Sequence, residues 1–363
     1  MPNRSYSLYN SNNPAGNDSP ASQAVLHFEH IDLLRVFAIL GVLFQHSSTY
    51  FSMAVGDTFC TQFCWRASRW CFLLFIFISG FLLIPKQISI SIMWERYIKR
   101  ILVVFLVWSV LYSCYNTIVL IGSTSDCSFF DLVKRFIGDV VSGGTDRLWY
   151  LVMLVGLYAI IPAISVLYNI NRVYIYVLLL LFIVSIFLPT LCCISPFETL
   201  LGTDIGRIMM VYPGYVVFYC LLGGGIRMIN RDILLKYKWF FYFFLIIAIP
   251  LIGVMVNHGN MPEMSFAGYF FIVMGLVIFS YDSFSKWPAI IKGVVKNIAE
   301  CSFGIYLIHT FIQYALLSLN VCNHLASFAP IWIAIPIYCL GLFIICWLCT
   351  WLIRRTPIGR RIT

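Results

Sequence analysis

Three ionisable side chains, Asp32, Arg35 and His46, lie within the apolar stretch from residue 31 to residue 50. Charged groups are costly inside hydrocarbon unless they reach the interface or face a cavity, so such residues indicate a functional site. Arginine pairs with anions such as phosphate, and histidine exchanges protons near neutral pH. The stretch therefore predicts a functional site within the membrane.

The spacing of Arg35 and His46 places both side chains on one side of a helix. From Arg35 to His46 an α-helix turns through about 1100°, about 20° past three full turns, and rises roughly 16.5 Å. Asp32 lies one turn before Arg35 and can pair with it. The alternative is structural: Arg35, paired with Asp32, reaches the interface from a helix end, and His46 is a satisfied polar residue near the far interface.

The composition is that of an integral membrane protein. Hydrophobic residues make up 61% of the 363 residues and charged residues 11%, whereas soluble domains have about 25% charged residues. Windows of about 20 apolar residues mark membrane helices. We expect an all-α bundle of about ten transmembrane helices, at residues 31–51, 69–85, 101–121, 148–168, 173–191, 207–226, 239–256, 265–282, 300–319 and 329–353. The sixth is the least regular because Pro213 and Gly214 interrupt it.

The basic residues are distributed unevenly between the two sides of this predicted bundle. With a cytosolic N-terminus, most of the 24 Lys and Arg residues fall on the cytosolic side. Few fall outside: Arg66, Arg69, Lys134, Arg135, Arg147 and Arg207. The asymmetry predicts a multi-pass protein of the inner (plasma) membrane with both termini in the cytosol. The net charge of +9 is then a topology signal, and no nucleic-acid partner is expected.

Three segments follow from this topology. Residues 1–28 are polar and lack the apolar core of a signal peptide, so we expect no cleavable signal but a disordered cytosolic tail. Residues 29–355 form the transmembrane domain, and residues 356–363 form a basic cytosolic tail. Within the outer loops, residues 129–141 are amphipathic, which predicts either a helix on the outer interface or a lid that packs on the bundle.

The thirteen cysteines follow no metal-binding spacing, and no metal site is expected. Many fall in apolar segments, where a thiol behaves as a small hydrophobic group. The others fall in inter-helix loops on the outer side, where disulfides can form but pairing cannot be deduced: Cys60, Cys64, Cys127, Cys192, Cys193 and Cys322.

Five short motifs occur in order along the chain: Arg35 followed by His46, Phe-Ile-Ser-Gly-Phe-Leu-Leu at 77–83, Arg-Tyr-Ile-Lys-Arg-Ile at 96–101, Leu-Trp-Tyr-Leu at 148–151, and Ser-Phe-Gly-Ile-Tyr-Leu-Ile-His at 302–309. This series resembles the acyltransferase-3 family of ten-helix membrane acyltransferases, over about residues 28–353. No single motif is specific, but their order, the Arg–His spacing and the topology together are. The chain resembles the stand-alone members, which lack a C-terminal hydrolase-like domain. It departs at Phe303, where the family usually has Tyr.

The resemblance implies transfer of an acetyl group from cytosolic acetyl-CoA to a hydroxyl of an envelope glycan, such as a lipid-linked O-antigen or a related polysaccharide. Succinyl transfer is the alternative within this class. Such a donor needs a basic mouth for its phosphates. Arg96, Lys99 and Arg100 stand at i, i+3 and i+4 and are the candidate entrance, with Arg35 as a further contact. Alternatively, these three residues only keep this end of the helix on the cytosolic side, as positive charges commonly do.

Within this reading His46 is the catalytic residue and Arg35 its partner. His46 acts as a general base on the acceptor hydroxyl, or carries the acyl group itself. The expected supporting residues are Asp32, Ser79, Trp149, Tyr306 and His309. Ser79 is expected to allow close helix packing beside Gly80, and Trp149 to stack on a sugar or belong to an aromatic belt.

Two other functions compete with this reading. The first is a transporter or flippase for a lipid-linked glycan, which about ten spans and an interrupted sixth helix would fit. Against it, the sequence has no detectable inverted repeat and no carboxylate placed in mid-membrane. The second is a non-catalytic partner in polysaccharide synthesis.

Overall fold

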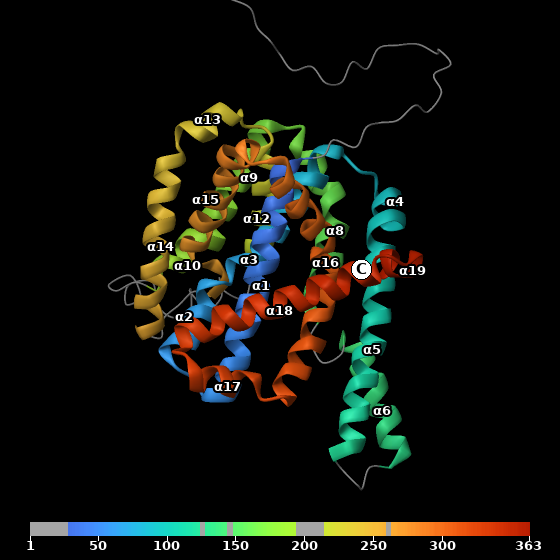
Figure 1. Cartoon of the computed structure of the whole chain (residues 1–363). Coiled ribbons are helices and arrows are strands. Elements are labelled where there is room, and N and C mark those ends of the chain that lie inside the picture. The colour runs from blue at the N-terminus through green and yellow to red at the C-terminus, as the bar shows by residue number, and fades with distance from the viewer. Residues whose placement is uncertain (1–27, 124–127, 144–147, 194–213, 259–262) are drawn as a thin grey trace, which may run out of the picture.

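The computed structural model describes residues 28–123, 128–143, 148–193, 214–258 and 263–363. Within these ranges the regular elements are helices (Figure 1). The longer ones are α1 (Glu29–Val55), α3 (Trp70–Leu83), α5 (Lys99–Ser123), α6 (Phe129–Val141), α8 (Trp149–Tyr168), α9 (Asn171–Phe182), α12 (Gly214–Ile226), α14 (Lys238–His258), α15 (Ala267–Ser283), α16 (Ala289–Ser318) and α18 (Ile331–Ile353). Short helices connect or extend them: α2 (Phe59–Ala67), η1 (Ile84–Lys86), α4 (Ile90–Ile92), η2 (Met93–Ile98), η3 (Ile183–Phe187), α10 (Leu188–Leu191), α13 (Arg231–Lys236), η4 (Glu263–Ser265), η5 (Phe284–Lys286), α17 (Val321–Phe328) and α19 (Pro357–Ile362).

The predicted all-α membrane bundle is confirmed. In the part of the chain that the structure describes, nine helical stretches are long and apolar enough to cross a membrane. The predicted sixth span, 207–226, is described only from residue 214, where α12 is a shorter apolar helix, Gly214–Ile226. The largest shift of a boundary is in α16, which begins at Ala289 rather than near residue 300. The tail at 1–28 lies almost entirely outside the described residues.

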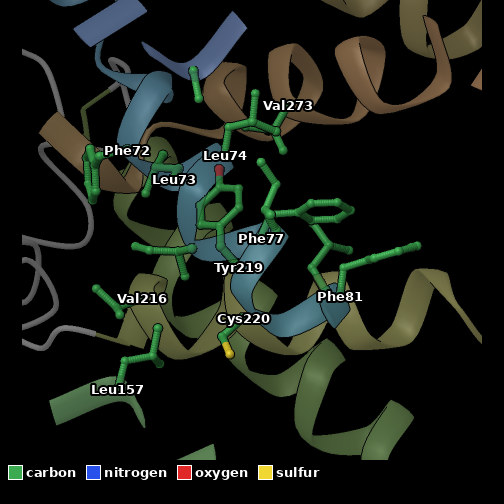
Figure 2. Packing of buried hydrophobic residues seen from close by; sticks show 14 of the residues in the cluster. Phe72, Leu73, Leu74, Phe77, Phe81, Leu157, Val216, Tyr219, Cys220 and Val273 are labelled. Atoms are coloured by element: carbon green, nitrogen blue, oxygen red, sulfur yellow. The ribbon is translucent and has the colours of Figure 1, made fainter. Parts of the chain in front are cut away.

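Helix α3 lies at the centre of the bundle. Its sequence is apolar on all sides, as expected of a helix that packs against neighbours all round. On one side it packs on α12 (Figure 2), and the two helices are closer than ordinary side chains allow. A Cβ added to Gly80 would lie 1.9 Å from the carbonyl oxygen of Cys220, and one added to Gly223 would lie 2.0 Å from the carbonyl oxygen of Phe77. The two backbones therefore touch, in the way that small residues permit in membranes.

A second hydrophobic cluster joins α1, α16 and α18. Leu34 and Ala38 of α1 belong to the cluster around α3, whereas Ile39 and Leu43 belong to the second cluster. Helix α1 thus lies between two packed regions, and its remaining side is available to line a cavity.

Helices α5 and α6 extend beyond the rest of the bundle (Figure 1). The amphipathic segment 129–141 is α6, which packs on α5 with a hydrogen bond from Asn116 to Asp139 of 3.1 Å. Its apolar residues Phe130, Val133 and Ile137 are exposed. Their exposure favours the interface helix over the lid that packs on the bundle.

The last described helix, α19, covers most of the predicted basic tail. It lies beside α5 (Figure 1), where the Trp108 indole donates a hydrogen bond of 3.0 Å to the Ile362 carbonyl. Thr363 is buried, and a Cβ added to Gly304 of α16 would lie 2.9 Å from it. This segment is therefore packed against the bundle.

The cysteines that were expected in outer loops lie mostly in short helices, which is a correction of the sequence prediction. Cys60 and Cys64 belong to α2, and Cys322 belongs to α17. These thiols and those of Cys192 and Cys193 are free. Cys127 lies outside the described residues.

Candidate active site

A cavity of about 390 Å³ lies between α1, α3, α8 and α16. Its lining combines two cations, a histidine, several hydroxyl groups and an aromatic wall. The lining residues are Arg35, Val42, Gln45, His46, Cys71, Phe72, Phe75, Ile78, Ser79, Leu82, Leu83, Lys86, Tyr97, Trp149, Tyr150, Leu154, Tyr158, Met264, Ser302, Phe303 and Tyr306.

Arg35 and His46 both line this cavity, as their helical spacing predicts. Arg35 also forms the predicted pair with Asp32, with 3.2 Å between Nη1 and Oδ1. The Asp32 carboxylate is buried, whereas the Arg35 side chain is about one-third exposed. Because a guanidinium group carries five N–H donors, the pair orients Arg35 without using all of them. Arg35 can therefore bind a second anion from the cavity.

The structure brings His46 of α1 next to His309 of α16. Their ring centroids are 4.8 Å apart. His46 is half-buried because it faces the cavity, whereas His309 is 3% exposed and lies behind it. The His309 ring thus forms part of the support on which the His46 ring rests.

The hydrogen bonds of His309 define its tautomer. Its Nδ1 lies 2.5 Å from the Tyr306 carbonyl oxygen. A carbonyl oxygen only accepts, so Nδ1 carries the hydrogen. Nε2 of the neutral ring then accepts a hydrogen bond from the Thr310 hydroxyl, 3.3 Å away. His309 is held in one orientation by its own helix.

Aromatic rings form the wall of the cavity around His46. Tyr306 lies 5.6 Å from Tyr150 and 5.8 Å from His309, between ring centroids. Trp149, which is the first residue of α8, lies 6.2 Å from Tyr150 and 5.7 Å from Phe72. Trp149 remains about half exposed at the edge of the cavity. The wall therefore continues from the interior to a mouth at this end.

Ser79 faces the cavity rather than the tight helix contact. Its hydroxyl donates to the Phe75 carbonyl at 3.1 Å and lies 3.5 Å from the Tyr158 hydroxyl. The close packing that was expected of Ser79 and Gly80 is made by Gly80, which faces α12. The Ser79 and Tyr158 hydroxyls thus form a polar pair in the wall of the cavity.

Of the four cations expected to contact the donor, only Arg35 lines the cavity. Lys86 lines it together with Arg35, whereas Arg96, Lys99 and Arg100 are exposed and do not. Lys99 pairs with Glu95 at 3.4 Å.

Residues Met93–Ile98, which include Arg96, form a π-helix. Its wider turn changes which side chains share a face, compared with the α-helix assumed from the spacing. Tyr97 faces the cavity from it and packs edge-on against Tyr158, 6.2 Å away. A role of Arg96, Lys99 and Arg100 in donor entry stays a prediction.

Sequence reasoning missed several residues of the site. Gln45 accepts a hydrogen bond from the thiol of Cys71, with a distance of 3.4 Å, and both line the cavity beside His46. Tyr158 follows Tyr150 and Leu154 at four-residue intervals, and this stripe on α8 was a readable signal. Lys86 had no such signal, because it follows Pro85 at a chain reversal where Gln87 has a left-handed conformation.

The chemistry of the lining fits a phosphate-bearing substrate. Arg35 and Lys86 supply positive charge at one end, and His46 with its aromatic neighbours lies toward the other end. Within the described ranges no group of three metal-ligating side chains was found.

Comparison with known proteins identifies the family but no individual relative. No match was found among curated proteins or among solved structures. The family model described as an acyltransferase domain, acyltransferase-3, matches residues 28–353, nearly the whole chain. The protein therefore belongs to the acyltransferase-3 family and is a membrane acyltransferase.

Proposed function

We propose that the protein transfers an acetyl group from acetyl-CoA to a hydroxyl of an envelope glycan, such as a lipid-linked O-antigen or related polysaccharide. The observation that carries the proposal is that Arg35 and His46 line one cavity. Its volume, about 390 Å³, lies within the range of about 300–1,000 Å³ that is common for small-molecule sites. Family membership supplies the acyl-transfer chemistry.

The donor would enter from the end where Arg35 and Lys86 lie, which is the predicted cytosolic end. Their cations would bind phosphates of CoA, and the arm that carries the thioester would extend along the apolar middle of the cavity. The roughly 16.5 Å rise of α1 from Arg35 to His46 suits an extended arm of this kind. Arg96, Lys99 and Arg100 lie outside the cavity and would attract the anionic donor at longer range.

His46 would then act at the thioester. As the acceptor oxygen attacks the carbonyl carbon, an imidazole nitrogen of His46 takes the hydroxyl proton. The carbon–sulfur bond breaks, and the departing CoA thiolate receives that proton. A route in which His46 carries the acetyl group before the acceptor arrives uses the same residues. His309, held by Tyr306 and Thr310, would keep the His46 ring in place.

The acceptor would reach His46 from the end where Trp149 and Phe72 lie. Sugars stack on aromatic rings, and Trp149 is exposed at this mouth. The donor and the acceptor would thus enter the cavity from opposite ends and meet at His46.

The test measures label transfer by the full-length protein in nanodiscs. Radiolabelled acetyl-CoA and a lipid-linked glycan extract are supplied to wild type, His46→Ala and His324→Ala. We expect transfer by wild type and by His324→Ala, because His324 is exposed on α17 away from the cavity. Loss of a general base lowers rates by about 10²–10⁴-fold, so His46→Ala should be nearly inactive.

Two outcomes would contradict the proposal. Equal activity of wild type and His46→Ala would remove His46 from the chemistry. The second outcome has two parts: the wild-type protein neither binds acetyl-CoA nor moves label, and cells without the protein lose their surface glycan altogether. That result would favour the transporter or flippase. Supplying succinyl-CoA in parallel decides the acyl group.

A further inference from the structure

A second basic pocket lies at the junction of α16, α18 and α19, on a different side of α16 from the catalytic cavity. It has a volume of about 320 Å³. Arg354, Arg355 and Arg360 line it together with Trp351 and Glu300. Figure 1 shows α19 at the end of α18, beside α5. The proposed acyl transfer uses none of these residues.

The turn between α18 and α19 holds the arginines in place. The hydroxyl of Thr356 accepts a hydrogen bond of 3.0 Å from the Gly359 amide. A Cβ on Gly359 would lie 1.9 Å from the Ile353 carbonyl oxygen, so this close return needs glycine. As a result Arg360 Nε donates to the Arg354 carbonyl at 2.9 Å. The guanidinium group of Arg360 is thereby fixed beside the end of α18.

The pocket carries an excess of positive charge. Glu300 is the acidic residue in its lining, and its carboxylate lies 4.0 Å from Arg354 Nη2, at the limit of an ion pair. Three arginines therefore line the pocket with one glutamate. Cations at a helix C-terminus interact favourably with the helix dipole, but this interaction does not require their convergence on a pocket. Guanidinium groups in such an arrangement match the geometry of phosphate oxygens.

The surroundings of the pocket are those of a lipid site. The Arg355 guanidinium lies 3.8 Å above the ring of Trp351, which is exposed. Leu348 and Leu352, one turn apart on α18, are also exposed, as is Ile344. These apolar side chains extend from the pocket along the part of α18 that is apolar enough to cross a membrane. A soluble phosphate compound would not contact this apolar face, whereas the acyl chains of a phospholipid would pack on it.

We propose that this pocket, which we call the α18–α19 pocket, binds the phosphate headgroup of an anionic phospholipid. Arg354, Arg355 and Arg360 hold the phosphate, and the acyl chains lie on Leu348 and Leu352. Basic pockets between transmembrane helices bind anionic headgroups in this manner.

The experiment titrates full-length protein in detergent with phosphatidylglycerol and reads bound lipid by native mass spectrometry. One variant carries Arg354→Gln, Arg355→Gln and Arg360→Gln. Its matched control carries Arg172→Gln, Lys236→Gln and Lys296→Gln, which remove three exposed cations outside the pocket. Phosphatidylcholine with the same acyl chains, inorganic phosphate and CoA are titrated in parallel.

We expect phosphatidylglycerol to bind wild type and the control variant alike, and more tightly than phosphatidylcholine. Each basic residue near an anionic lipid contributes about fivefold, so the pocket variant should bind about 100-fold more weakly. Glu300→Gln removes the competing carboxylate and should strengthen binding about fivefold. This gain keeps the proposal testable if the triple variant does not fold.

Three results would overturn the proposal. The first is equal loss in the pocket variant and its control, which would mean general charge attraction. The second is equal affinity for phosphatidylcholine. The third is displacement of phosphatidylglycerol by CoA at similar concentrations, which would assign the pocket to a soluble phosphate ligand instead.

Discussion

The two sides of α3 differ in what they contact. On one side, Gly80 packs on Cys220 of α12 so closely that no side chain fits between them. On the other side, Phe75 and Ser79 border the cavity that contains His46. The packed side fixes the position of α3 in the bundle, and the open side presents its surface to the substrates. Changes on the first side should therefore reduce stability, and changes on the second should reduce activity with little loss of stability.

The largest expected effect is on the open side, in the pair of histidines. His46 faces the cavity and His309 lies behind it, so His46→Ala should lower kcat about 10²–10⁴-fold, and no conservative replacement of His46 should restore it. His309→Ala should have a smaller effect. His309→Asn should recover much of the wild-type rate, because its amide N–H can replace the Nδ1–H that bonds the Tyr306 carbonyl.

Single-turnover rates with thermal unfolding measured in parallel would separate these variants. If His309→Asn were as inactive as His46→Ala at equal stability, then His309 would take part in the chemistry itself rather than position His46.

The next effect belongs to the packed side. Gly223→Ala would place a methyl group about 2.0 Å from the Phe77 carbonyl oxygen, which belongs to the backbone and cannot turn away. Overpacking of this kind costs about 1–3 kcal/mol. Gly341→Ala is the control, because a Cβ there meets nothing within 4 Å. A lowered melting temperature for Gly223→Ala alone is expected in detergent. Equal melting temperatures of the two variants would mean that α3 and α12 do not pack as described.

A smaller effect concerns the donor end of the cavity. Lys86→Gln should raise KM for acetyl-CoA about fivefold, with kcat little changed. A partly exposed charge contact contributes about 1 kcal/mol, and this free energy corresponds to about a fivefold change in affinity. Arg96→Gln removes an equal charge outside the cavity and should change KM less. The reverse order would place the donor phosphates at the turn Met93–Ile98, as the sequence motif suggested.

The positions of Arg35, Lys86 and Arg96 show which parts of the donor site were predictable from the sequence. The alignment of Arg35 with His46 depends on a single regular helix, so the 3.6-residue period was sufficient to predict that they share a face. The position of Lys86 depends on a chain reversal after α3, and the position of Arg96 depends on a π-helical turn. Neither feature follows from hydrophobic periodicity, because both depend on how neighbouring helices pack.

The contact between His46 and His309 was unpredictable for a similar reason. Both residues were candidates, but they lie on helices far apart in the sequence, and only the packing of α1 on α16 brings their rings together. The role of Gly80 was predictable in kind, since small residues allow close packing in membranes. Its neighbour Ser79 was assigned to the same contact because their sequence positions alone do not show which of them faces the cavity.

The smallest effect is at Ser79, which lies on the open side although its neighbour Gly80 lies on the packed side. Its hydroxyl donates to the Phe75 carbonyl, and the Tyr158 hydroxyl, which would lose its contact with Ser79, lines the cavity, so Ser79→Ala should change stability by less than about 0.5 kcal/mol. The change should lower kcat/KM no more than about threefold, because the Tyr158 hydroxyl, 3.5 Å away, remains in the cavity. Ser79→Val fills the same wall with a branched side chain and should inhibit donor binding more strongly than Ser79→Ala. Isothermal titration with CoA measures this difference. A complete loss of transfer in Ser79→Ala at normal stability would instead make the serine hydroxyl a participant in acyl transfer, and would move the chemical centre away from His46 toward the middle of the cavity.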